Sequence, residues 1–212
     1  MTFARAREMS TIYNSIYLAS RSPRRKELLQ RIGIRFHDLL ESADGAIQVD
    51  ETPATSEDPA EYVMRLARAK AGAAMHFLQT RSLPVCPVLA ADTTVALGGH
   101  IFGKPDTARH AAAFLAELSG RTHSVFTAVA VASESRIETE LSASAVEFRQ
   151  LSDMDIQRYV ATGEPLDKAG AYAIQGDAAA FVRALNGSYS GIMGLPVFQT
   201  LALLRRFGVT PM

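Results

Sequence analysis

The 212-residue chain contains a single cysteine, Cys86, so it cannot form an internal disulfide. A lone cysteine is typical of a reducing compartment, and we interpret Cys86 as a small core or loop residue. No apolar run approaches the roughly 18 residues of a membrane span. The first 15 residues carry arginines but lack the apolar centre of a secretory signal. The sequence therefore predicts a cytoplasmic protein with no membrane partner.

Net charge is also absent, because 22 Lys and Arg residues balance 22 Asp and Glu residues. A general nucleic-acid binder is usually basic, so nucleic acid is not expected as a partner and any anion site must be local. Hydrophobic residues make up 48% of the chain, which argues against a disordered protein. The sequence has no G-x-x-x-x-G-K-[ST] loop, no G-x-S-x-G elbow and no paired histidines for zinc.

Strands and helices alternate early in the chain, and a hairpin-rich region follows. Residues 15–20 and 34–40 read as strands, and a helix between them starts with a Ser22 cap and Pro23. Residues 59–79 show the 3.6-residue period of a long helix, and "VLAADTTVALGGHIF" reads as a strand, a Gly-Gly turn and a short strand. The pattern favours an α/β fold, a mixed sheet flanked by helices and bent into two lobes with a cleft.

Arg24 and Arg25 stand in the first turn of the predicted helix, although a helix N-terminus already carries partial positive charge. They are either solvated surface residues or part of an anion site. Free N–H groups of the first turn and two guanidinium groups together favour phosphate. Their position directly after a strand favours the anion site, because strand ends of α/β sheets open onto clefts.

Three other charged residues do not fit their surroundings. Lys70 falls inside the apolar stripe of the long helix, where it must extend to solvent, pair with a carboxylate or face a ligand. Asp92 lies in an apolar strand, where a lone carboxylate is costly unless it pairs or binds metal. Lys104 follows the hairpin that carries Asp92, and its alternative is an exposed loop position. An Asp–Lys pair with a purely structural role is the other reading of Asp92.

The segment "GEPLDKAGAYAIQG", residues 163–176, combines polar groups with small residues. It is either a solvated loop or a place where backbone approaches a flat ligand closely. Gln175 can donate and accept hydrogen bonds, which suits the edge of a base. Lys168 adds a further cation. With the carboxylates Glu51 and Asp92, these cations suit Mg²⁺ or Mn²⁺ on a polyphosphate.

Several of these motifs occur in an order that resembles the Maf family of nucleoside triphosphate pyrophosphatases. They are "LASRSPRRKELL", "VDE", "RLARAKA", "AADTTVAL", "FGKP", "LSGRTHSVFTAV", "GEPLDKAGAYAIQG" and "NGSYSGIMGLPV". The resemblance covers nearly the whole chain. It implies an elongated mixed sheet with two lobes and a central cleft, similar to the inosine-triphosphate pyrophosphatase group. We expect residues 1–14 to form an N-terminal extension and residues 15–212 a single domain, with a homodimer as one open alternative.

The resemblance also implies cleavage of a nucleoside triphosphate to the monophosphate and pyrophosphate, with a divalent cation. Asp92 matches the general base of the family, and Arg24, Thr93 and Gln175 match positions linked to substrate choice. "DKAGAYAIQG" resembles the branch that acts on dTTP and UTP. Two alternatives are the branch that acts on 7-methyl-GTP and a non-catalytic regulator of septum formation.

The resulting hypothesis places the triphosphate over Ser20, Ser22, Arg24 and Arg25, with charge added by lysines. Glu51 and Asp92 would hold the cation, or Asp92 would accept the proton of the attacking water. The sequence leaves both roles of Asp92 open. Arg21 departs from the family pattern, because small residues are common at its position.

Overall fold

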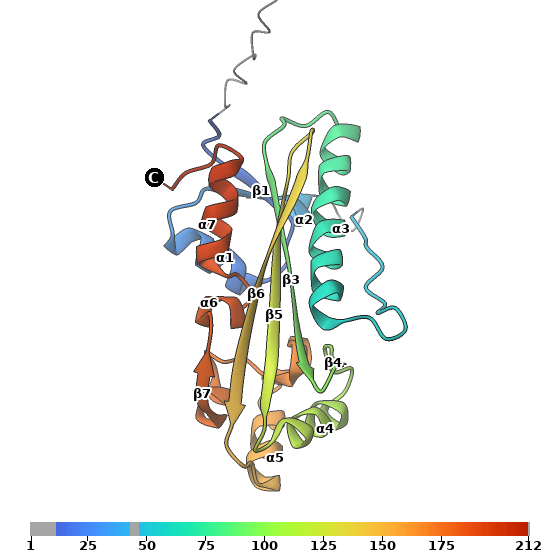
Figure 1. Cartoon of the computed structure of the whole chain (residues 1–212), viewed down its shortest axis with the longest axis vertical. Helices are drawn as coiled ribbons and strands as arrows, with labels where there is room; N and C mark the ends of the chain where they lie inside the picture. Colours follow the sequence, from blue (N-terminus) through green and yellow to red (C-terminus); the bar gives the residue numbers. More distant parts are fainter. Residues whose placement is uncertain (1–11, 43–46, 212) are drawn as a thin grey trace, which may run out of the picture.

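The computed structural model describes residues 12–42 and 47–211, so residues 1–11 of the predicted extension lie outside the described part. Within it, seven strands form one mixed sheet, in the order β2-β1-β3-β5-β6-β7, with β4 also paired to β3. Figure 1 shows an elongated molecule in which the three long strands β3, β5 and β6 follow the long axis. The strands are β1 (Ile16–Leu18), β2 (Phe36–Asp38), β3 (Val88–Leu97), β4 (His100–Phe102), β5 (Thr122–Ala132), β6 (Ile137–Phe148) and β7 (Val182–Asn186).

Helices cover both faces of the sheet. They are α1 (Pro23–Arg31), α2 (Leu39–Ser42), α3 (Pro59–Thr80), α4 (Ala108–Leu118), α5 (Asp153–Ala161), α6 (Tyr189–Ile192) and α7 (Val197–Arg206), with 3₁₀ turns at Glu164–Asp167, Ala169–Ala171 and Asp177–Phe181. α3 lies along one face in Figure 1, and α1 and α7 lie on the other side. None of the helices in the described residues combines the length and apolar character needed to cross a bilayer.

Two apolar clusters lie on opposite faces of β3. Val88 and Ala90 pack in the cluster that contains the buried residues of α3, whereas Leu89 and Ala91 pack in the cluster of α1, α4 and α7. This alternation follows from the two-residue period of a strand. The predicted mixed sheet with flanking helices is therefore confirmed.

Local sequence signals account for several element boundaries. Pro23 is the first residue of α1, as predicted, and Ser22 occupies the N-cap position. However, Ser22 makes no side-chain cap bond, and its own N–H donates to Ser20 Oγ at 3.3 Å. The Gly98–Gly99 turn joins β3 to β4 with φ values of 59° and 82°, which glycine adopts at low cost.

The predicted strand at residues 34–40 is wrong in its second half. Only Phe36–Asp38 pairs with β1, and residues 39–42 form α2 instead. Asp38 causes this change, because its Oδ1 accepts hydrogen bonds from Leu40 N at 3.1 Å and Glu41 N at 3.2 Å. An Asp that satisfies the free N–H groups of a first turn starts a helix.

Gly170 joins the segment that carries Lys168 to the segment that carries Lys104. Its N–H donates to Gly103 O at 3.1 Å. Its φ is 68°, and a Cβ at this position would lie 2.7 Å from a methyl carbon of Val95. Both backbone conformation and close packing therefore require glycine here.

We expect Gly170→Ala to lower the free energy of unfolding by about 2 to 5 kcal/mol, the sum of left-handed backbone strain and overpacking. Gly163→Ala is the matched control, because Gly163 has a φ of 76° but no atom within 4 Å of its added Cβ. It should lose only the backbone part, about 1 to 2 kcal/mol. Urea unfolding measures both variants, and equal losses would contradict the packing argument.

Candidate active site

The site forms where the sheet is interrupted. On the side of β3 away from β5, β1 pairs with residues 88 and 89, and β4 pairs with residues 95–97. No described strand pairs with residues 90–94 on that side. Side chains from both faces of β3 can therefore reach one opening.

A pocket of about 980 Å³ occupies this opening. Its wall includes residues 91–95 of β3, the start of α1, the segment around Glu51 and the segment around Lys168. The predicted site residues that line it are Ser20, Ser22, Arg24, Arg25, Glu51, Lys70, Asp92, Thr93, Lys104 and Lys168.

Asp92 points to the α3 face, where it pairs with Lys70. Lys70 Nζ lies 2.6 Å from Asp92 Oδ1 and 2.7 Å from Glu51 Oε1, so one ammonium joins the two carboxylates. The Asp92 side chain is only 12% exposed. A carboxylate so nearly buried needs a charged partner, and Lys70 supplies it. The break in the apolar stripe of α3 is explained by this pair.

Thr93 points to the opposite face, where it contacts Arg25 of α1. The Arg25 guanidinium donates to Thr93 Oγ1 at 3.2 Å, to Ser20 Oγ at 3.1 Å and to Gly194 O at 2.7 Å. The three guanidinium nitrogens thus donate to three segments: the residues just before α1, β3, and the loop after α6. The side chain is fixed in the pocket wall before any ligand binds.

The charge of Arg25 has no ion-pair partner among the described residues, because all three acceptors are neutral. Burial lowers the pKa of the guanidinium, and the Asp92 carboxylate opposes the shift. An arginine nevertheless stays charged. A fixed cation that is held by neutral groups in a pocket wall attracts an anionic ligand.

The remaining predicted cations differ in their surroundings. Arg24 Nε donates to Met193 O at 3.4 Å, so Arg24, like Arg25, contacts the loop after α6. Lys168 pairs with its neighbour Asp167. Lys104 lies in the pocket wall without an ion-pair partner in the described residues.

Gln175 is placed differently from the other predicted residues. It is exposed and is not among the residues that line the pocket. The sequence placed it in the site because a glutamine amide suits a base edge. Its part in base choice stays a prediction.

Two residues that the sequence did not indicate contact predicted site residues, and one of them, Tyr62, also lines the pocket. Thr127 is buried on β5, and its Oγ1 lies 3.0 Å from Thr93 Oγ1 and 2.7 Å from Gly191 O. Tyr62 donates its hydroxyl to Glu51 O at 2.9 Å. Burial, and then the carboxylates of Asp92 and Glu51, raise the pKa of Tyr62 to about 12, so it remains a donor. The 3.6-residue period that places Lys70 among the apolar residues of α3 could have drawn attention to Tyr62, eight residues earlier. Nothing in the sequence distinguishes Thr127 from an ordinary strand threonine.

Glu51 and Asp92 are the two residues that could hold a divalent cation. The described residues contain no group of three or more His, Cys, Asp or Glu side chains that could hold a metal ion. However, both carboxylates lie within 2.7 Å of one cationic atom, Lys70 Nζ. Oxygen ligands in this number fit Mg²⁺, which binds through one or two carboxylates and takes its other ligands from water and phosphate.

Known proteins similar to this chain show the family to which it belongs. A family model described as "Maf-like protein" matches residues 15–207. The dTTP/UTP pyrophosphatase of Aromatoleum aromaticum is 55% identical over 204 residues, which are 94% of this chain and 98% of that protein. A protein of the same name from Nitrosomonas europaea is 51% identical over 199 residues, 93% of this chain and 96% of that protein.

A third relative with that name, from Cupriavidus metallidurans, is 53% identical over 194 residues, 92% of this chain and 97% of that protein. The family match extends over all the described strands and helices, from β1 to α7. The chain therefore belongs to the Maf family.

Proposed function

We propose that the chain hydrolyses dTTP and UTP to the nucleoside monophosphate and pyrophosphate. The observation that carries this proposal is the pocket wall itself, where a carboxylate pair on Lys70 lies next to the neutrally held Arg25. This combination suits a ligand that is anionic and brings a divalent cation. The curated relatives with 51–55% identity are named for this activity.

We infer that the pocket is the central cleft between two lobes, similar to the inosine-triphosphate pyrophosphatase group, within one domain from residue 15 to residue 212. Nucleoside triphosphates are intracellular metabolites, so the proposed activity agrees with a cytoplasmic location.

The triphosphate would lie against the first turn of α1. Ser22 leaves the N–H groups of this turn without a side-chain cap, and a helix N-terminus favours phosphate. Arg24 and Arg25 add guanidinium donors at the same place. Lys104 and Lys168, from the two segments joined at Gly170, would add charge from another part of the wall.

Asp92 would accept the proton of a water that attacks the α-phosphorus, and pyrophosphate would leave with its charge stabilised by the cations. Lys70 engages Oδ1 of Asp92, and the described residues give Oδ2 no donor. One oxygen is thus held in place, and the other would accept the proton. A geometry of this kind serves a general base.

Mg²⁺ or Mn²⁺, when bound by Glu51 and Asp92, would neutralise phosphate charge. Asp92 is thereby left with two roles, as base or as cation ligand. Lys70 contributes in either case. Its flexible side chain would let the ammonium turn from the carboxylates to a phosphate oxygen.

The preference for thymine and uracil nucleotides rests on the names of the relatives more than on contacts. The Thr93 hydroxyl already contacts Arg25 and Thr127, and Gln175 is exposed. The branch that acts on 7-methyl-GTP is therefore the first alternative. A non-catalytic nucleotide-binding regulator of septum formation is the second, although it would not need a nearly buried carboxylate beside the phosphate site.

A panel of triphosphates separates these functions. In Mg²⁺, dTTP and UTP should release pyrophosphate and no orthophosphate, with kcat/KM at least about tenfold above that of dCTP, GTP and 7-methyl-GTP, because polar base edges discriminate strongly. Faster turnover of 7-methyl-GTP would assign the other branch. Binding of dTTP without any hydrolysis would favour the regulator.

Asp92→Asn tests the proposed base. The amide keeps the size of the side chain but cannot take up the proton, so turnover of dTTP should fall by at least about a hundredfold. Asp153→Asn is the control, because Asp153 is an exposed residue at the start of α5. Steady-state pyrophosphate release measures both. Near-normal release by Asp92→Asn would remove Asp92 from the mechanism.

Arg25→Lys tests the neutrally held cation. Lysine keeps the charge, but it cannot contact three acceptors in a fixed fork, so kcat/KM should fall about ten- to a hundredfold. Arg31→Lys is the matched control on the same helix, where Arg31 is 68% exposed and pairs with Glu27. If the two variants have the same kcat/KM for dTTP, the fork has no role in binding.

A further inference from the structure

Glu51 reaches the pocket from a segment without helix or strand. Residues 47–58 have no regular secondary structure, and α3 begins directly after them. The Glu51 side chain is 56% exposed, so packing does not hold it. Its Oε1 nevertheless lies 2.7 Å from Lys70 Nζ. This distance therefore depends on how the backbone around Glu51 is held.

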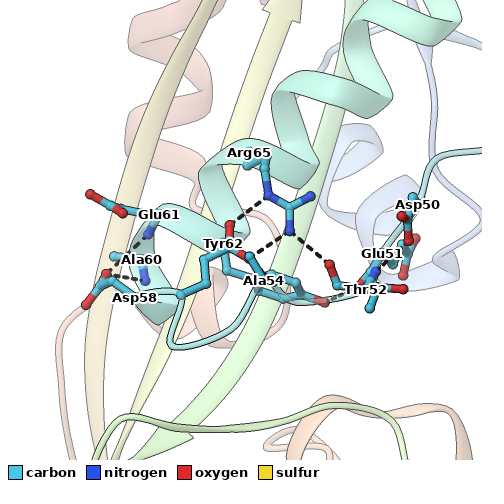
Figure 2. Close-up of polar contacts among 10 residues, drawn as sticks. Asp50, Glu51, Thr52, Ala54, Asp58, Ala60, Glu61, Tyr62 and Arg65 are labelled. Carbon is cyan, nitrogen blue, oxygen red and sulfur yellow. Dashed lines mark hydrogen bonds and ion pairs between the residues drawn. The ribbon is translucent and has the colours of Figure 1, made fainter.

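Two side chains of α3 donate hydrogen bonds to that backbone, as Figure 2 shows. Tyr62 donates its hydroxyl to Glu51 O at 2.9 Å, and Arg65 donates to Thr52 O at 3.2 Å. The Arg65 guanidinium also lies 5.5 Å from the centre of the Tyr62 ring. Tyr62 and Arg65 thus contact each other, and together they bind two consecutive carbonyl groups of the segment.

Glu57 connects Arg65 to the far end of the same segment. Arg65 binds both carboxylate oxygens of Glu57, at 2.7 and 2.8 Å, and Glu57 Oε2 also accepts from Ala54 N at 2.9 Å. The hydrogen bonds from Arg65 lower the pKa of Glu57 to about 2, so this carboxylate is charged at neutral pH. One guanidinium thus closes the segment on itself and onto α3. Bidentate pairs of this type are the most directional that side chains form.

α3 also carries the partner of Glu51. Tyr62 and Lys70 are eight residues apart on this helix, a spacing that falls within one stripe about 100° wide. Arg65 and Glu57 do not line the pocket. They therefore do not contact a ligand in the pocket, and they act on its position through the residues that they hold.

We propose that Arg65 is a positioning residue, which fixes Glu51 opposite Asp92 by binding Glu57 and the Thr52 carbonyl. The assignment rests on the proposed function, because it gives Glu51 a role in holding the divalent cation of the triphosphate. Loss of the Arg65 fork frees the segment, so that Glu51 spends less time at the position where it meets the cation. Cation affinity should weaken, whereas the contacts of the nucleotide with α1 remain.

The test measures cation affinity without turnover. The probe is Mn²⁺ with a dTTP analogue that has a methylene group between the α- and β-phosphorus, and electron paramagnetic resonance counts free Mn²⁺. Arg65→Lys should raise the Mn²⁺ dissociation constant about tenfold, the usual effect of losing a charged hydrogen bond. With dTTP, the Mg²⁺ concentration for half-maximal rate should rise by a similar factor. Glu57→Gln should act in the same direction and provides the test if Arg65→Lys does not fold.

Arg68→Lys is the matched control. Arg68 is exposed on the same helix, donates to Ile137 O at 3.1 Å and does not line the pocket. It should leave the Mn²⁺ dissociation constant unchanged. A general loss of helix stability would affect both arginine variants.

The Glu51→Gln background separates positioning from structure. If Arg65 acts through the Glu51 carboxylate, Arg65→Lys should change Mn²⁺ affinity by less than about twofold in that background, because the coupling partner is gone. An unchanged tenfold effect there would overturn the proposal, as would equal affinities of Arg65→Lys and Arg68→Lys in the wild-type background. Failure of the proposed function looks different, because wild-type protein would then release no pyrophosphate from dTTP or UTP at any Mg²⁺ concentration.

Discussion

An interruption of the sheet on one side of β3 is the constraint from which the site follows. β1 and β4 pair with the two ends of this strand and leave residues 90–94 open between them. Consecutive side chains of a strand point to opposite faces. Asp92 therefore meets α3 and Thr93 meets α1, yet both reach the same pocket. A continuous sheet would have kept the Asp92 and Thr93 side chains apart on its two faces.

The opening brings together two electrostatic environments. On Lys70, two carboxylates share one ammonium, which leaves this group of three with a net negative charge. Arg25 has neutral acceptors instead, so its positive charge remains available. A metal-bound polyanion complements both environments at once, with the cation toward the carboxylates and phosphate oxygens toward the arginine. This division is a stronger argument for the ligand than the number of charged residues in the pocket.

The parts of this arrangement that could be predicted are those with a local signal. Pro23 at the start of α1 and the Gly98–Gly99 turn each satisfy a nearby backbone requirement, and both lie where the sequence indicated. Lys70 could be found because it breaks an apolar period. Thr127 and the Gly194 carbonyl could not, because a buried hydroxyl and a backbone acceptor resemble their neighbours in sequence. Asp38 misled the prediction by turning a strand into a helix within two residues.

α3 positions both carboxylates of the site, because residues of this one helix contact Asp92 and the segment that carries Glu51. Lys70 reaches Asp92 on the sheet, while Tyr62 and Arg65 hold the backbone that carries Glu51. A helix keeps such side chains at fixed separations, whereas an irregular segment does not. The exposed Glu51 side chain thus obtains the precision of α3 without belonging to it.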